Sequence, residues 1–173
     1  NIGGRAKAYF KDQELKELVE ILKILANREK IHIIGAGSNT LITEEFYDGI
    51  VIKLGKNFNR LSILNSNIII SGTAVLDTKL SEFAAKNNLS GFEFLYCIPG
   101  TIGGGLKMNA GCFGREIKDI VVSIQAIDMT GNISTIPAEK IDFEYRNNNL
   151  PENLIFLSAS FKGKKQDSKL IFE

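Results

Sequence analysis

Residues 98–114 read Ile98-Pro-Gly-Thr-Ile-Gly-Gly-Gly-Leu-Lys-Met-Asn-Ala-Gly-Cys-Phe-Gly114, and six of these seventeen residues are glycine. Glycine has no Cβ, so it adopts positive φ at little cost and lets another group lie against the bare backbone. A loop with a purely structural role rarely needs so many such positions close together. The segment therefore predicts a site where a flat or phosphate-bearing ligand lies on the peptide backbone.

A second glycine turn, Gly35-Ala-Gly-Ser-Asn-Thr40, follows a short apolar stretch. Its N–H groups and its hydroxyl and amide side chains suit a diphosphate, and a hydrogen bond to a charged group contributes roughly 1.5–3 kcal/mol. The turn lacks the third glycine and the downstream acid of the dinucleotide fingerprint, so we reject a Rossmann domain. Taken alone, it is equally typical of an ordinary loop at the end of a strand.

The composition indicates one globular domain or two small ones. The chain has 173 residues, of which 44% are hydrophobic and 24% charged, with a formal net charge of +1. This charge gives no field that attracts nucleic acid or an anionic membrane, and no apolar run approaches the ~20 residues of a membrane span. Cys97 and Cys112 indicate no disulfide framework and are expected to be small buried residues. No residue pattern indicates a metal site.

Hydrophobic periodicity predicts a mixture of helices and strands. The expected elements are, in chain order, strand 6–10, helix 13–27, strands 31–34, 49–54 and 67–71, helix 78–87, a hairpin of 121–128 with 133–137, and strand 156–162. Asp12 is the expected cap of the first helix. The apolar residues expected on one face of that helix are Leu15, Leu18, Ile21, Leu22 and Leu25.

Four motifs occur in a specific order along nearly the whole chain. They are Gly35-Ala-Gly-Ser-Asn39, Ile98-Pro-Gly-Thr-Ile-Gly-Gly104, Asn109-Ala-Gly-Cys-Phe-Gly-Arg-Glu-Ile117 and Tyr145-Arg-Asn147. In this order and spacing the motifs resemble the UDP-N-acetylenolpyruvoylglucosamine reductase family, also called UDP-N-acetylmuramate dehydrogenases. Ile2-Gly-Gly-Arg-Ala6 also looks like the start of that family's first flavin domain. The four motifs together are far more specific than any one of them.

The resemblance implies an α+β chain with the two-subdomain FAD-binding fold of the vanillyl-alcohol-oxidase/PCMH type. A small α/β subdomain, residues 1–56, would precede a larger subdomain on an antiparallel sheet, residues 57–173, with FAD held non-covalently between them. The family places its proton-donating serine and a catalytic glutamate in a third, C-terminal substrate-binding domain, which is absent from this sequence. We therefore expect a part of a longer protein that binds FAD but is inactive alone.

The activity implied by the resemblance is an NADPH-dependent reduction. NADPH would reduce the FAD, and the reduced flavin would transfer a hydride to the enolpyruvyl group of UDP-N-acetylglucosamine enolpyruvate. The product, UDP-N-acetylmuramate, is a precursor of peptidoglycan. The implied partners are this nucleotide sugar and NADPH, with no nucleic acid and no membrane, and the protein is expected to be a cytoplasmic monomer.

Positions that match the family's motifs give the expected site. Tyr145 and Arg146 match the substrate side, and Arg146 is the expected catalytic residue because a guanidinium stabilises charge that develops on the substrate carboxylate. Two positions depart from the family, since Ala74 stands where glycine is common and Asn148 where serine is common. The expected cofactor-binding residues are Gly35, Ala36, Gly37, Ser38, Asn39, Thr40, Gly72, Thr73, Pro99, Gly100, Ile102, Gly103, Gly104, Asn109, Ala110 and Gly111.

Two alternatives stay open. The first is another FAD oxidoreductase of the same fold, such as a small-alcohol or hydroxy-acid oxidase, which Tyr145-Arg146 and the absence of histidine from the diphosphate turn argue against. The second is a non-catalytic flavin-binding or nucleotide-sensing module. The single histidine, His32, lies within expected strand 31–34 and is interpreted as structural.

Overall fold

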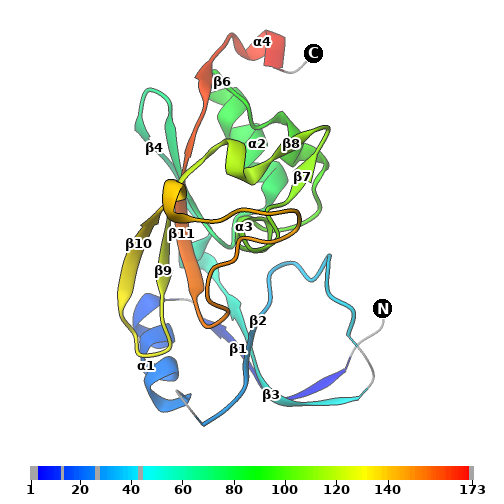
Figure 1. Cartoon of the computed structure of the whole chain (residues 1–173), viewed down its shortest axis with the longest axis vertical. Coiled ribbons are helices and arrows are strands. Elements are labelled where there is room, and N and C mark those ends of the chain that lie inside the picture. Colours follow the sequence, from blue (N-terminus) through cyan, green and yellow to red (C-terminus); the bar gives the residue numbers. More distant parts are fainter. Residues whose placement is uncertain (1–3, 13, 26–27, 43–44, 172–173) are drawn as a thin grey trace.

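The computed structural model describes residues 4–12, 14–25, 28–42 and 45–171. Its first part is a three-stranded parallel sheet in the order β1-β3-β2, flanked by one helix (Figure 1). The predicted helix 13–27 is confirmed over Leu15–Leu25, while residues 13, 26 and 27 lie outside the described ranges and Glu14 is a bend. Asp12, the expected cap, is the last residue of β1. The elements are β1 (Arg5–Asp12), α1 (Leu15–Leu25), β2 (Ile31–Ile33) and β3 (Phe46–Leu54).

The second part is built on a five-stranded antiparallel sheet in the order β10-β9-β11-β5-β4. The predicted hairpin is confirmed, and the strand that pairs with β5 at the sheet edge was not predicted. Together with the parallel sheet, this confirms the α+β fold class. The strands are β4 (Leu61–Asn65), β5 (Ile68–Gly72), β9 (Val121–Ile127), β10 (Ile133–Pro137) and β11 (Ile155–Lys162).

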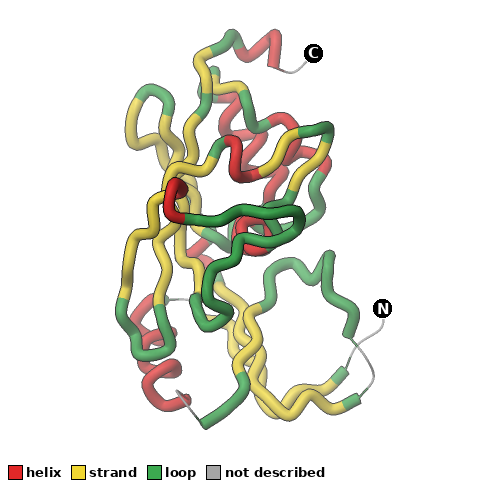
Figure 2. Tube along the Cα trace, viewed as in Figure 1, coloured by secondary structure: helices red, strands yellow, loops and turns green. Residues whose placement is uncertain are grey.

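Short helices cover one face of the larger sheet (Figures 1 and 2). The α-helices of this part are α2 (Asp77–Lys86), α3 (Ile102–Lys107) and α4 (Ser168–Ile171). The 3₁₀ turns are η1 (Lys56–Phe58), η2 (Glu93–Cys97), η3 (Ile117–Asp119) and η4 (Ala138–Lys140), and the short strands are β6 (Leu89–Ser90), β7 (Gly111–Cys112), β8 (Arg115–Glu116) and β12 (Lys164–Lys165). None of the helices within the described ranges has the length and apolar character needed to cross a membrane.

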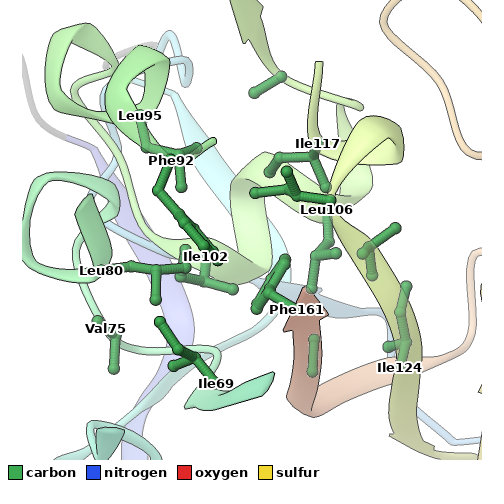
Figure 3. Close-up of a cluster of buried hydrophobic side chains, with 14 of the residues drawn as sticks. Ile69, Val75, Leu80, Phe92, Leu95, Ile102, Leu106, Ile117, Ile124 and Phe161 are labelled. Atoms are coloured by element: carbon green, nitrogen blue, oxygen red, sulfur yellow. The ribbon is translucent and has the colours of Figure 1, made fainter. Parts of the chain in front are cut away.

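The main core lies between this sheet and α2 and α3. Leu80, Ile102, Leu106 and Phe161 are fully buried in one cluster (Figure 3). Burial of a side chain of this size stabilises the fold by roughly 1.5–3 kcal/mol. The glycine segment is therefore anchored in the core by the two large side chains of α3.

A second core joins the two parts of the chain. Leu18 and Leu22 of α1 pack in the same cluster as Ile127 of β9 and Leu157 of β11. The tip of the β9–β10 hairpin also reaches α1, because a Cβ added to Gly131 would lie 3.4 Å from a methyl of Val19. The boundary predicted between residues 56 and 57 falls within η1, and the division into two subdomains stays a prediction.

Candidate functional site

The two glycine turns lie against each other although they are far apart in the sequence. A Cβ added to Gly35 would lie 2.4 Å from the Thr101 hydroxyl, and one added to Gly100 would lie 3.6 Å from the Ser38 hydroxyl. Glycine at position 35 therefore permits this close approach. We call residues 35–40 together with residues 99–104 the glycine platform.

Part of the platform is helical, which the sequence analysis did not foresee. Helix α3 follows the first turn of the segment, and its Gly103 amide donates to the Thr73 carbonyl at 2.9 Å. Several glycines serve packing, because an added Cβ would lie 2.6 Å from Ile117 at Gly105 and 2.5 Å from the Arg115 carbonyl at Gly111. The high glycine content of this segment therefore allows close packing, a role that the sequence did not predict.

The expected cofactor residues fall into two sets by exposure. The buried set supports the platform from behind: the Thr73 hydroxyl, 3% exposed, donates to the Phe156 carbonyl at 2.6 Å. The buried residues are Gly72, Thr73, Ile102, Asn109 and Ala110. The exposed or half-buried residues are Gly35, Ala36, Gly37, Ser38, Asn39, Thr40, Pro99, Gly100, Gly103, Gly104 and Gly111.

Asp77 lies beneath the platform and was missed by the sequence analysis. Its side chain is 0% exposed, and burial raises the pKa of its carboxyl to about 7. Neither carboxyl oxygen has a hydrogen-bond partner among the described residues. The only signal in the sequence was the ordinary preference for aspartate in the first turn of a helix.

These features fit a ligand that carries both acceptor oxygens and hydroxyl donors. Exposed turn residues such as Ser38 and Asn39 offer donors, and the Asp77 carboxyl lies directly behind Gly100. Buried polar groups in proteins are nearly always hydrogen-bonded, so the unpartnered Asp77 carboxyl indicates a place for a donor. FAD has a diphosphate and a hydroxyl-bearing chain, and the residues present fit it.

Tyr145 and Arg146 form the centre of a tight turn beside this region. Glu144 and Asn147 close the turn with two backbone hydrogen bonds of 3.0 and 3.3 Å. Arg146 has a φ of 57°, and its guanidinium lies 5.4 Å from the centroid of the exposed Tyr145 ring. We call residues 144–147 the Arg146 turn; it presents both predicted substrate residues to the solvent.

Two buried asparagines hold the Arg146 turn on the end of the glycine segment. The Asn109 amide donates to the Glu144 carbonyl at 3.0 Å, and the Asn148 amide donates to the Leu106 carbonyl at 3.1 Å. Asn148 is 0% exposed, so it ties the turn to α3 and does not face the surface. Serine, the residue common at this position in the resembled family, is shorter than asparagine by the amide group.

A cleft of about 480 Å³ separates the Arg146 turn from the β7–β8 hairpin. Two of its basic side chains are paired with acids, Arg115 with Asp119 at 3.4 Å and Lys118 with Glu116 at 2.6 Å. The Glu116 hydrogen bond raises the pKa of Lys118. Within the described part of the chain Arg146 has no ion pair, so its charge is available to an anionic ligand. The lining residues are Gly111, Cys112, Phe113, Gly114, Arg115, Glu116, Lys118, Asp119, Tyr145 and Arg146.

The predictions for the two cysteines and for the single histidine are confirmed only in part. Cys97 is exposed, so the expectation that both cysteines are buried is wrong for it; it ends η2 at the surface, just before the platform. Cys112 is half-buried and lines the cleft. His32 lies in β2 as expected, with its ring edge-to-face to Tyr47 at a centroid distance of 6.4 Å.

Comparisons with known proteins show what this chain is similar to. The UDP-N-acetylenolpyruvoylglucosamine reductase of Pelagibacter ubique (strain HTCC1062) is 62% identical over 99% of this chain and 57% of the relative. The Rickettsia massiliae (strain Mtu5) reductase is 47% identical over 98% of the chain and 57% of the relative. The chain thus spans 57% of the length of these relatives, and the predicted family resemblance is confirmed.

Solved structures show the same fold. The crystal structure of the Thermus caldophilus UDP-N-acetylenolpyruvylglucosamine reductase (MurB) matches with a TM-score of 0.85 at 28% identity, over 99% of this chain and 60% of the other. A carbon monoxide dehydrogenase from Hydrogenophaga pseudoflava matches with a TM-score of 0.67 at 14% identity, over 95% and 61%. The predicted FAD-binding fold is confirmed. The model of the FAD binding domain family matches residues 6–136, and the chain belongs to that family.

Proposed function

We propose that this chain is the FAD-binding part of a UDP-N-acetylenolpyruvoylglucosamine reductase. The reaction is the NADPH-dependent reduction of UDP-N-acetylglucosamine enolpyruvate to UDP-N-acetylmuramate, a step of peptidoglycan precursor synthesis in the cytoplasm. The observation that carries this proposal is the 62% identity to such a reductase over 99% of the chain. The protein acts as a monomer, without nucleic acid or membrane.

The glycine platform holds FAD without a covalent bond. Backbone N–H groups and the side chains of Ser38, Asn39 and Thr40 bind the diphosphate, because they are exposed at the point where the two glycine turns meet. Gly104 leaves the backbone bare for the rest of the cofactor, while Gly100 and Gly103 pack against Asp77 and Thr73 behind it. The buried residues Gly72 and Thr73 keep α3 in place beneath it.

Arg146 binds the carboxylate of the enolpyruvyl group. When bound and reduced by NADPH, FAD supplies the hydride. Hydride addition places negative charge on the carbon next to that carboxylate, and a guanidinium already fixed there stabilises the charge as it develops. The Tyr145 ring under the guanidinium restricts its position by a cation–π contact.

The first test is the absorption spectrum of the purified chain before and after heat release of any bound ligand. Flavin bands in the native protein, with FAD and not FMN in the supernatant, support the assignment of a non-covalent FAD site. A colourless chain that also takes up no added FAD contradicts it.

The second test joins this chain to the part of the Pelagibacter ubique reductase that it does not span. We expect the chimera to consume NADPH only when UDP-N-acetylglucosamine enolpyruvate is present, and Arg146→Gln to remove most of this activity. The unmodified relative serves as the control for the assay. A flavin-loaded chimera that reacts with oxygen but not with this substrate points instead to an oxidase of the same fold.

A further inference from the structure

Burial of the Asp77 carboxyl destabilises the fold, and no contact within the described residues offsets this effect. Its carboxyl is fully buried at the start of α2, and neither oxygen has a hydrogen-bond partner among the described residues. A buried polar group without a partner destabilises a protein because its desolvation is not compensated. Such a group is rare in proteins and points to a role outside the packing of the chain itself.

The carboxyl sits at the seam of the glycine platform. A Cβ added to Gly100 would lie 2.8 Å from one Asp77 oxygen and 3.6 Å from the Ser38 hydroxyl. A Cβ added to Gly105 would lie 3.2 Å from the second Asp77 carboxyl oxygen. The side-chain direction of Gly100 therefore points between Asp77 and Ser38. Gly100 is half-buried and Ser38 exposed, so the buried Asp77 carboxyl lies directly behind residues at the surface where the cofactor is proposed to bind.

A role in starting the helix does not account for the side chain. The residue that caps α2 is Leu76, and no side-chain capping bond is formed there. The backbone of Asp77 already anchors the turn, because its amide donates to the Gly100 carbonyl at 3.2 Å. An aspartate on the solvent side of the first turn would interact with the helix dipole equally well without being buried.

We propose that Asp77 is a cofactor-binding residue whose carboxyl accepts a hydrogen bond from a hydroxyl group of bound FAD at the seam between Gly100 and Ser38. The proposal rests on the proposed function, since it assumes that the platform binds FAD. The partner is a hydroxyl because this group suits either state of the carboxyl: it donates to a carboxylate and accepts from a protonated acid, whereas a phosphate oxygen offers no donor to a carboxylate. Asp77 thereby recognises the polyol or ribose portion of the cofactor.

The experiment titrates the cofactor-free chain with FAD, following flavin fluorescence, and measures urea unfolding of the same samples without FAD. For Asp77→Leu we expect affinity for FAD to fall about tenfold or more, while the cofactor-free protein unfolds at the same or a higher urea concentration. For Asp77→Asn we expect affinity within a few-fold of the wild type, because the carboxamide oxygen still accepts a hydrogen bond.

Ser90→Ala is the matched control. The buried Ser90 hydroxyl donates to the Lys164 carbonyl at 3.2 Å, in the β6–β12 pair away from the platform. Removing this partnered group is expected to lower stability and leave FAD affinity unchanged. Asp77→Leu that binds FAD like the wild type, or that loses stability as Ser90→Ala does or fails to fold, overturns the proposal. A wild-type chain that binds no FAD refutes the proposed function itself.

Discussion

The side-chain amide of Asn109 donates to the backbone carbonyl of Glu144 at 3.0 Å, and this bond joins the glycine segment to the turn that presents Arg146. The side-chain oxygen of Asn109 accepts a hydrogen bond from the backbone amide of Lys118 at 3.1 Å. One buried side chain therefore links the glycine segment, the Arg146 turn and η3. Asn109 thus connects the proposed cofactor and substrate sides of the site, as Asn148 also does. A change at Asn109 should therefore affect both the stability of the chain and the position of Arg146.

Asn109→Asp tests this connection. Aspartate keeps the shape and can still accept from the Lys118 amide, but it places a carboxylate oxygen against the Glu144 carbonyl. We expect a loss of roughly 1–3 kcal/mol in the free energy of unfolding near neutral pH, and a higher KM for the enolpyruvyl substrate in the chimera. At acid pH the protonated side chain donates again, so the stability difference should shrink. Urea unfolding at neutral and acid pH measures it, and a pH-independent difference contradicts the assignment.

Arg146→Gly should separate stability from activity. Arg146 has a φ of 57°, a left-handed conformation that costs residues other than glycine about 1 kcal/mol. The glycine variant is therefore expected to be as stable as the wild type or more stable by up to about 1 kcal/mol, yet its chimera should lose turnover. Arg146→Lys keeps the charge without the planar fork and should retain stability with intermediate activity. A glycine variant with wild-type turnover would remove Arg146 from the mechanism.

The buried Asp77 carboxyl predicts a specific pH dependence of stability without FAD. Its pKa is about 7 in the folded chain against a usual 3.8, so the folded state holds the proton that the unfolded state releases between these values. Stability therefore falls as pH rises through this window, with a slope of at most about 1.4 kcal/mol per pH unit. Asp77→Asn should lack this contribution and gain on the wild type from about pH 4 to about pH 7.

Asp128 does not obscure that measurement. Hydrogen bonds from Thr130 and Asn132 in the β9–β10 turn lower the pKa of Asp128 to about 2. The stability that Asp128 contributes is present above its unfolded pKa and is lost only as pH falls toward 2. Urea unfolding of wild type and Asp77→Asn at about pH 5 and about pH 8 checks the prediction. If the two proteins differ in stability by the same amount at both pH values, the prediction is contradicted.

The sequence predicted the elements whose signal is local. The hairpin β9–β10 was predicted within one residue of its observed bounds, because alternating residues flank a turn that contains Gly131, whose φ is 92°. Helix α3 was missed because three consecutive glycines disfavour a helix. Tertiary contacts override that preference, since Ile102 and Leu106 are both fully buried in the main core.

In the site, too, features with a local sequence signal were predicted and features that depend on tertiary contacts were not. The motifs located the glycine platform and the Arg146 turn, because those residues are contiguous in sequence. Asp77 was missed and the role of Asn148 was not predicted, since these roles depend on burial and, for Asn148, on a partner distant in the chain. No local pattern shows that the Asn148 amide meets a carbonyl 42 residues away. Long-range hydrogen bonding of this kind is a property of the folded chain.

Gly72→Ala tests whether the buried set supports the platform. A Cβ at Gly72 would lie 2.0 Å from the Phe58 carbonyl, a backbone atom that cannot move aside cheaply, so β5 or η1 must shift. We expect a loss of about 3 kcal/mol or more in the free energy of unfolding, and weaker FAD binding because α3 is hydrogen-bonded to the next residue, Thr73.

Gly114→Ala is the control for Gly72→Ala. Gly114 has a φ of 74° with nothing within 4 Å of an added Cβ, so only its backbone conformation is penalised, by about 1 kcal/mol. Thermal unfolding of both variants, with FAD titration at a temperature where both are folded, makes the comparison. If Gly72→Ala costs no more than Gly114→Ala and binds FAD normally, then the Phe58–Gly72 contact is not what holds α3 in place, and the platform must be supported by the core side chains of α3 alone.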